Sequence, residues 1–243
     1  MMINIALDQD SYQLRYPIYI RWDVERYPHL LLTGASGSGK TYLLKIILAN
    51  LAARIPNSRM FVCDFKGDSD FTFLEGLSGF YRYFEVQNGL DAFAGLLRER
   101  QSRGDKTVPY FLVFDEYAAF LNALDKKQAD HAKQTLALLL MMGRSFNLHV
   151  IVSVQRADAA YFSTARDNFS AVIAMGRLSK EAVDMLFSEY KEEIRRDKSR
   201  GEGSCLMGAK LADLVVPRIR DPDRLELVIR CCLAGQDRAG AKP

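Results

Sequence analysis

The residues with the clearest chemistry form one glycine-rich stretch. Gly34 to Thr41 reads Gly-Ala-Ser-Gly-Ser-Gly-Lys-Thr, which fits the pattern G-x-x-x-x-G-K-[ST] without a mismatch. Glycines allow positive φ angles, so consecutive backbone N–H groups can turn inward onto phosphate oxygens. The stretch therefore predicts a loop that binds a nucleoside triphosphate. The residues expected to bind it are consecutive: Gly34, Ala35, Ser36, Gly37, Ser38, Gly39, Lys40, Thr41 and Tyr42.

The flanks of this loop strengthen the prediction. A run of apolar residues, His29–Thr33, precedes it, and apolar residues at helical spacing follow over Leu43–Leu51. A strand before the loop and a helix after it make an accidental glycine-rich turn a poor explanation. We expect Lys40 to reach the β- and γ-phosphates of ATP and the Thr41 hydroxyl to hold Mg²⁺.

A pair of carboxylates follows a second apolar run. Asp115 and Glu116 come directly after Tyr110–Phe114, which places both at the carboxyl end of a predicted strand, where ligands bind in α/β sheets. Asp115 is expected to bind Mg²⁺ through water, and Glu116 to activate the water that attacks the γ-phosphate. The alternative is a solvated acidic pair at the start of the next helix.

The second carboxylate narrows the class of enzyme. A kinase must keep water away from the γ-phosphate, so a residue that activates water favours hydrolysis coupled to motion. A guanine-reading Asn-Lys-x-Asp is not found at Leu124–Lys127. The fragment Gly76–Phe80 only superficially resembles the signature of ABC-type ATPases, and it lies before the carboxylates, where that signature does not belong.

Composition sets broad limits. The chain has 243 residues, 49% of them hydrophobic, and a net charge of +3, which neither demands nor excludes a nucleic-acid partner. The spacing of its four cysteines does not fit a zinc site. Without a signal-peptide pattern or a long apolar run, a cytoplasmic chain is expected, with a membrane or targeting partner protein where it works at a membrane.

The apolar runs also predict the fold. Because they are apolar at nearly every position and alternate with helical stretches, they favour a three-layer α/β sandwich with a mainly parallel, RecA-like sheet. The predicted core strands are His29–Thr33, Met60–Cys63, Tyr110–Phe114, His149–Val154 and Ala171–Ala174, with a short strand near Phe80–Phe84.

The ends of the chain are expected to elaborate one motor domain spanning residues 1–243. Residues 1–28 read as an antiparallel β flap with strands near Ile3–Leu7 and Pro17–Ile20. Residues 191–243 read as a hairpin and helix extension, with a strand at Ser204–Met207 and a helix at Arg224–Leu233.

Gln155 ends the run that begins at His149. Beside the strands that carry the phosphate loop and the carboxylates, a glutamine can sense the γ-phosphate and polarise water, so Gln155 is a candidate catalytic residue. The alternative is an amide that caps a neighbouring backbone group.

Together these segments resemble the FtsK/HerA superfamily of DNA-pumping ATPases, particularly FtsK/SpoIIIE-like motors and conjugative coupling ATPases. The resemblance covers Pro17 to about Gly208. It is carried by PHLLLTGASGSGKTYLL, FVCDFKGDSDF, YFLVFDEYAAFL, GRSFNLHVIVSVQRAD, AVIAMGRLSKEAVDMLF and GEGSCLMG. The sequence departs from the family's usual Gln-Arg-Pro, because Ala157 stands in place of proline, and it lacks the family's membrane helices and winged-helix domain.

The resemblance implies a homo-oligomer, a hexameric ring with ATP between subunits and DNA in the channel. It implies that Arg144 or Arg177, with Arg144 preferred, acts as an arginine finger on a neighbour's nucleotide. A surface salt bridge is the alternative. Two basic stretches, Asp125–Lys133 and Lys191–Arg200, are expected to be loops that contact DNA, although both could be solvated helix faces. Lys66 is a candidate sensor of nucleotide or neighbour.

Three functions therefore compete. The leading hypothesis is an ATP-driven DNA translocase or transfer motor. The second is a DNA-independent secretion or assembly ATPase. The third is a nucleotide-controlled switch, which Glu116 disfavours because a switch has little use for a strong activator of water.

Overall fold

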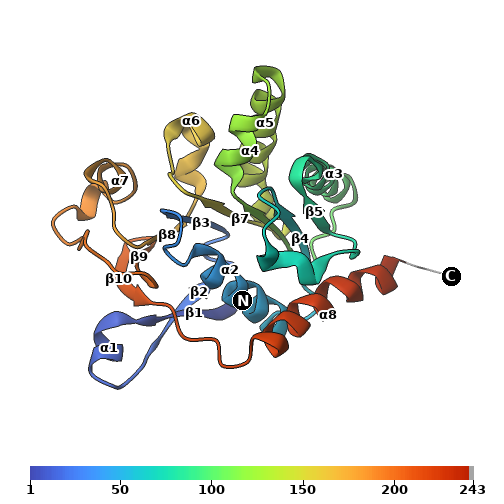
Figure 1. The fold of residues 1–243 in the computed structure, drawn as a ribbon. Helices are drawn as coiled ribbons and strands as arrows, with labels where there is room; N and C mark the ends of the chain where they lie inside the picture. The colour runs from blue at the N-terminus through green and yellow to red at the C-terminus, as the bar shows by residue number, and fades with distance from the viewer. Residues whose placement is uncertain (241–243) are drawn as a thin grey trace.

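A computed structural model describes residues 1–240, and these contain a ten-stranded sheet in the order β2-β1-β10-β9-β8-β3-β7-β6-β4-β5 (Figure 1). The strands from β8 to β5 run parallel, and the remaining four are added antiparallel. The strands are β1 (Met2–Asp8), β2 (Tyr19–Asp23), β3 (His29–Gly34), β4 (Arg59–Asp64), β5 (Phe80–Arg82), β6 (Tyr110–Asp115), β7 (Leu148–Val154), β8 (Ala171–Met175), β9 (Glu202–Met207) and β10 (Lys210–Val215).

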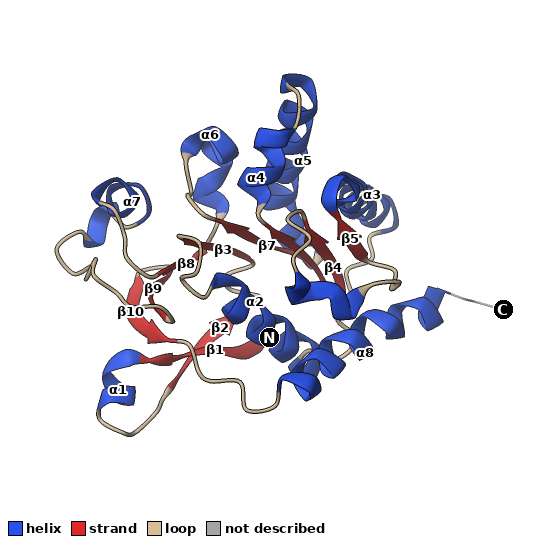
Figure 2. Ribbon diagram, in the orientation of Figure 1, coloured by secondary structure: helices blue, strands red, loops and turns tan. Residues whose placement is uncertain are grey.

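Helices cover both faces of this sheet (Figure 2). One hydrophobic core lies under α2 and α8, and a second lies under α3, α4, α5 and α6. The predicted three-layer α/β sandwich with a mainly parallel sheet is therefore confirmed. The helices are α1 (Gln9–Gln13), α2 (Lys40–Arg54), α3 (Val86–Arg103), α4 (Tyr117–Ala123), α5 (Lys126–Met142), α6 (Ala159–Phe162), α7 (Lys180–Leu186) and α8 (Pro222–Gly240), with short 3₁₀ turns that include η1 (Ser69–Leu74) and η3 (Gly143–Phe146).

The central strands are buried on both faces, as their continuous apolar runs predict. Every residue of β3 and of β7 is buried. Parallel pairing in register brings the carboxyl ends of these strands to one edge of the sheet, with Asp64 directly opposite Asp115. This edge carries the loop that follows Gly34, so the fold itself brings glycines and carboxylates together.

The two ends of the chain extend the sheet. The predicted N-terminal flap is an antiparallel pair, but its second strand begins at Tyr19 rather than Pro17, and β1 also pairs with β10. The expected C-terminal hairpin is β9 and β10, and α8 starts at Pro222, before the predicted Arg224. Residues 241–243 of the predicted extension lie outside the described residues.

One expectation about local structure is wrong. Asp125–Lys133 is not a loop, because α5 begins at Lys126. Asp125 is the N-cap of this helix: its Oδ1 accepts the Gln128 backbone N–H at 2.8 Å, and the Gln128 side chain accepts the Asp125 N–H at 3.4 Å. The charged residues face solvent while small alanines face the core, so the helix carries few large apolar residues in its first turns.

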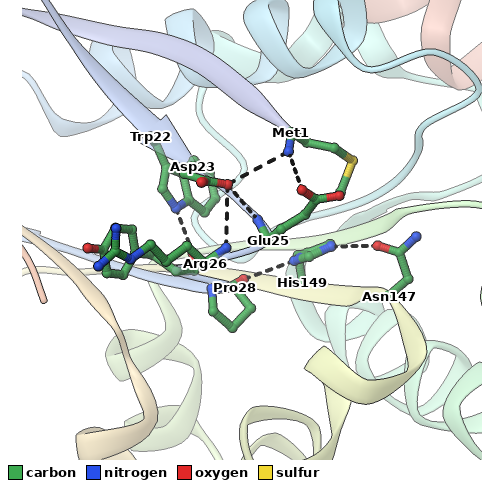
Figure 3. Close-up of polar contacts among 9 residues, drawn as sticks. Met1, Trp22, Asp23, Glu25, Arg26, Pro28, Asn147 and His149 are labelled. Carbon is green, nitrogen blue, oxygen red and sulfur yellow. Dashed lines mark hydrogen bonds and ion pairs between the residues drawn. The ribbon is translucent and has the colours of Figure 1, made fainter.

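Two buried histidines lie at the opposite, amino edge of the sheet. The Nδ1 atom of His149 bonds to the Pro28 carbonyl at 3.3 Å, and its Nε2 atom lies 2.9 Å from Asn147 Oδ1 (Figure 3). The Val150 backbone N–H donates to His29 Nδ1 at 3.1 Å. Burial lowers the pKa of His29 to about 3 and that of His149 to about 4, so both rings are neutral parts of the core.

Candidate nucleotide-binding site

The loop between β3 and α2 has a backbone that only glycine adopts easily. Gly34, Gly37 and Gly39 have φ angles of +149°, +77° and +104°. A Cβ atom at Gly34 would lie 2.5 Å from the carbonyl oxygen of Met175 on β8, whereas one at Gly37 would have no described atom within 4 Å. Gly34 is therefore required by space as well as by conformation. Such a loop at the N-terminus of a long helix is suited to bind an anion.

Lys40 lies inside this loop. It is 5% exposed, and its Nζ donates to the carbonyls of Gly34 at 2.7 Å and Ala35 at 3.3 Å. Burial lowers the pKa of Lys40, and the nearby carboxylates of Glu116 and Asp115 oppose that shift. The buried Ser38 hydroxyl has no hydrogen-bond partner among the described residues. The loop thus holds a cation and an unsatisfied hydroxyl close together, a combination that fits phosphate oxygens.

Asp115 ends β6 directly beside the loop. Its Oδ2 lies 3.5 Å from the Thr41 hydroxyl oxygen, across 74 positions of sequence. Burial raises the pKa of Asp115 to about 6; Ser153 lowers it, and Glu116 and Asp64 raise it further. A hydroxyl and a carboxylate at this separation are ligands that Mg²⁺ prefers, so the residues present fit the expected metal.

Glu116 has an unusual backbone. Its φ and ψ of 58° and 40° lie in the left-handed region, which a residue with a side chain rarely adopts. Its N–H donates to Asp115 Oδ1 at 3.2 Å, and the residue forms the N-cap of α4. Strained backbone of this kind concentrates at functional sites. Here it turns the chain between β6 and α4 and leaves the half-exposed Glu116 on the wall of the pocket.

Most of these residues line one pocket of about 240 Å³, whereas Gly34 and Ala35 line a neighbouring cavity. The structure brings together Lys40, Thr41, Asp115 and Glu116, as the sequence analysis requires. It also places Lys66, the candidate sensor, on the pocket wall, and adds residues that the sequence analysis did not assign to nucleotide binding. The full lining is Ser36, Gly37, Gly39, Lys40, Thr41, Tyr42, Asp64, Lys66, Asp68, Asp70, Phe71, Asp115, Glu116 and Arg200.

Asp64 is one residue that sequence reasoning missed. It ends β4, is 2% exposed, and its Oδ1 accepts the Gly67 N–H at 2.9 Å. Its Oδ2 has no hydrogen bond among the described residues, although Arg82 Nε lies 4.0 Å away. Burial raises the pKa of Asp64. The signal was available in the sequence, because Asp64 follows an apolar run just as Asp115 does.

Three other candidates lie outside this pocket. Gln155 is exposed after β7 and lines a neighbouring cavity with Thr33 and Arg177, on another side of the phosphate loop. Arg177 forms an exposed ion pair with Asp197 at 3.2 Å. Arg144 is exposed and lies in η3, directly before β7. It is therefore at the amino edge of the sheet, opposite the pocket.

The comparisons with known proteins agree with this geometry. A family model described as "FtsK/SpoIIIE family" matches residues 10–175, from the N-terminal hairpin through the phosphate loop and the carboxylates to the end of β8. The chain belongs to the FtsK/SpoIIIE family. The resemblance seen in the sequence is confirmed at this level.

The relatives of this chain have names that state different roles. The FtsK domain-containing protein YdcQ of Bacillus subtilis is 27% identical over 209 residues, which are 78% of this chain and 43% of YdcQ. The pCW3 conjugation coupling protein TcpA, solved with ATPγS, superposes with a TM-score of 0.74 at 19% identity, covering 94% of this chain and 70% of TcpA. The cytoplasmic domain of the type VII secretion ATPase EccC of Thermomonospora curvata gives 0.71 at 20% identity, covering 96% of this chain and 31% of that chain.

The chain thus spans less than half the length of YdcQ, and the two solved structures show likeness of fold. Family membership and the pocket give the chain the phosphate loop and the carboxylates of a P-loop ATPase. Among the described residues, every helix is too short or too polar to cross a membrane.

Proposed function

We propose that this ATPase couples ATP hydrolysis to the movement of DNA, as a ring of identical subunits. The observation that carries the proposal is the meeting of Thr41, Asp115 and Glu116 on the wall of one pocket in a chain of the FtsK/SpoIIIE family. A carboxylate able to activate water favours a machine that turns ATP over repeatedly. The sheet is continuous from β2 to β5, so residues 1–243 are proposed to work as one motor domain.

The roles in hydrolysis follow from position. Lys40 balances charge on the β- and γ-phosphates, which replace the carbonyls of Gly34 and Ala35 as its partners. Glu116 accepts the proton of the attacking water. Thr41 and Asp115 hold Mg²⁺, which supplies positive charge to the phosphates when it is bound. With a pKa near 6, Asp115 is mostly ionised at pH 7 and can serve this role.

The charged surfaces point to one contact with DNA. Lys126 and Lys127 are exposed at the projecting tip between α4 and α5, and neither forms an ion pair among the described residues (Figure 1). By contrast, Lys191 pairs with Asp184 at 2.7 Å, and Lys198 is buried against Asp213 at 2.7 Å. Cations without protein partners are available to phosphates. Among the described residues, the stretch from 191 to 200 keeps only Arg196 and Arg200 without an ion pair, and Arg200 lines the nucleotide pocket, so the tip is the proposed DNA contact.

The test is steady-state ATPase activity with and without single- and double-stranded DNA. The double variant Lys126→Ala/Lys127→Ala should keep its basal rate and need several-fold more DNA for half-maximal stimulation. Its salt dependence should fall by about one unit of slope per lost phosphate contact. The matched control is Lys106→Ala/Lys210→Ala, which removes two exposed lysines elsewhere. Stimulation that is equal in both double variants would reject the tip as the DNA contact.

The match to EccC favours a second candidate, a secretion or assembly ATPase that moves protein. This candidate would be supported if the ATPase rate of the assembled protein is unchanged by single-stranded and double-stranded DNA. Very slow hydrolysis with tightly held ADP would instead select a nucleotide-controlled switch. Light scattering with ATP bound tests the ring: a hexamer is expected, and a monomer at all concentrations would contradict it.

A further inference from the structure

One side of the nucleotide pocket is built by a segment far from the phosphate loop in sequence. Arg200 lines the pocket together with Lys40, Thr41 and Tyr42, and it lies in the turn that leads into β9. The sequence analysis assigned this residue to a DNA-contacting loop. In the structure Arg200 lies at the nucleotide pocket, where a bound nucleotide would be within its reach.

The turn that carries Arg200 is bonded directly to the phosphate loop. The Gly201 N–H donates to the Ser38 carbonyl at 3.0 Å, and the Gly201 carbonyl accepts the Val216 N–H at 2.8 Å. The backbone of Gly201 lies 3.7 Å from where a Cβ on Gly39 would stand. The Glu202 carbonyl accepts the Gly176 N–H at 2.8 Å. The backbone that follows Arg200 is therefore fixed against the loop that holds the phosphates.

A buried ion pair anchors the same turn from behind. The Lys198 side chain is 2% exposed, and its Nζ lies 2.7 Å from Asp213 Oδ1 on β10. Ser204 Oγ donates to the same oxygen at 3.0 Å, and Arg195 Nε lies 3.0 Å from Asp213 Oδ2. A buried cation and anion that satisfy each other hold the backbone in one position, because separating them would leave a buried charge unpaired.

Arg200 itself contrasts with its basic neighbours. Arg195 and Lys198 are paired with Asp213, whereas Arg200 is exposed and has no ion pair among the described residues. The Arg200 guanidinium has no partner to balance its charge, and its turn contacts the phosphate-binding loop. A planar guanidinium can bind phosphate oxygens through two hydrogen bonds, so Arg200 is suited to bind a phosphate here.

We propose that Arg200 binds the α- and β-phosphates of the nucleotide held by its own subunit. The turn contacts Ser38 and Gly39, and a later segment contacts Tyr42, whose hydroxyl accepts the Ile219 N–H at 2.6 Å. This side of the pocket is formed by the end of the loop that leads into α2, whose backbone N–H groups are expected to hold the α- and β-phosphates. Lys198 and Asp213 are positioning residues that act through Arg200. The inference rests on the ATP site and does not depend on DNA as the substrate.

Equilibrium binding of fluorescent MgADP and MgATPγS to the full chain tests this assignment without reference to turnover. Arg200→Ala should weaken both nucleotides about tenfold, the size expected for one charge-assisted contact, and Arg200→Lys should recover part of the loss. The matched control is Arg196→Ala, which changes an exposed arginine of the same segment that has no ion pair with any described residue; this variant should bind as wild type does. Unchanged affinity for MgADP in Arg200→Ala would overturn the proposal, and weakening of MgATPγS alone would move the contact to the γ-phosphate and also overturn it.

The role of the anchor is tested by a double-mutant cycle. Lys198→Met keeps the length of the buried side chain, and its effect on MgADP affinity should largely disappear in the Arg200→Ala background. Equal effects in both backgrounds would show that Lys198 does not act through Arg200. Thermal unfolding of each variant identifies any loss of folded protein, and Arg200→Ala, being a surface change, decides the main proposal whatever the anchor variant does.

Discussion

At the scale of single residues, Glu116 is the side chain whose removal should separate binding from chemistry. Glu116→Gln keeps the size of the side chain and removes its ability to accept a proton, so the rate of phosphate release should fall at least about a hundredfold. The affinity for ATP should change little, because Lys40 and the loop are untouched. Phosphate release and equilibrium binding, compared with the exposed-site control Glu85→Gln, measure the two effects. A rate near that of wild type would remove Glu116 from the mechanism.

Two glycines of the phosphate loop should differ in what they tolerate. Gly34→Ala combines a strained φ with a contact of 2.5 Å to the Met175 carbonyl, whereas Gly37→Ala adds strain alone. We expect Gly34→Ala to lower the free energy of unfolding by about 2–4 kcal/mol and Gly37→Ala by about 1 kcal/mol. Urea unfolding of both variants without nucleotide gives the comparison. Equal midpoints for the two variants would show that the contact at Gly34 adds nothing to the cost of the strained φ angle.

The sequence identifies this site only in part. The spacing of Gly34–Thr41 and the strand-end position of Asp115 and Glu116 suffice to bring these residues together, because parallel strands end at one edge. Arg200 could not be found in this way. It reaches the pocket through β8 and β9 packing beside β3, and no local pattern in a charged stretch shows that contact. The left-handed backbone of Glu116 could not be predicted either, because glutamate is not a residue type that indicates this conformation.

At the scale of elements, the same difference between local and long-range information holds. Buried parallel strands show themselves as continuous apolar runs, and their predicted positions agree with β3, β4, β6, β7 and β8 to within a residue or two at each end. The sequence predicts a loop where α5 begins because the buried residues there are small. Ala129 and Ala132 face the core, but among charged neighbours they do not show the apolar spacing typical of a helix. Its N-cap, Asp125 with Gln128, was the better guide.

The amino ends of β3 and β7 should make stability depend on pH. The folded pKa values of His29 and His149, about 3 and about 4, lie below the ordinary value of 6.5, so the unfolded chain binds these protons more tightly. Their contribution to stability is fully present above pH 6.5 and is lost as the pH falls toward 4 and 3. The raised pKa of Asp115, about 6, acts in the opposite direction over part of this range.

Urea unfolding between pH 7.5 and pH 4.5 measures this dependence. His149→Gln keeps a polar group near the Pro28 carbonyl but cannot titrate, so the loss of stability on acidification should be smaller than in wild type. The exposed His131→Gln is the control and should follow the wild-type curve. A His149→Gln curve parallel to that of wild type would show that this ring takes up its proton equally in the folded and unfolded states, so that its folded pKa is not lowered.

At the scale of the whole molecule, the position of Arg144 bears on assembly. It precedes β7 at the amino edge of the sheet, whereas the nucleotide pocket lies at the carboxyl edge. Gly143 beside it has little freedom, since a Cβ there would lie 2.7 Å from the Leu148 carbonyl. An exposed arginine presented by a tightly packed turn on the far edge cannot serve the pocket of its own subunit, and it remains available to that of a neighbour.

This geometry makes a prediction that only an assembly can meet. Arg144→Ala should abolish most ATPase activity while leaving nucleotide affinity intact, because its pocket is complete but lacks a neighbour's arginine. Mixing Arg144→Ala with Glu116→Gln should restore activity, since a Glu116→Gln subunit can lend its Arg144 to a neighbouring pocket with an intact Glu116. Arg177→Ala, mixed in the same way, tests the other candidate. If the mixture of Arg144→Ala and Glu116→Gln is no more active than the sum of its parts, Arg144 does not act across the interface. If only the mixture of Arg177→Ala and Glu116→Gln regains activity, Arg177 is the arginine finger.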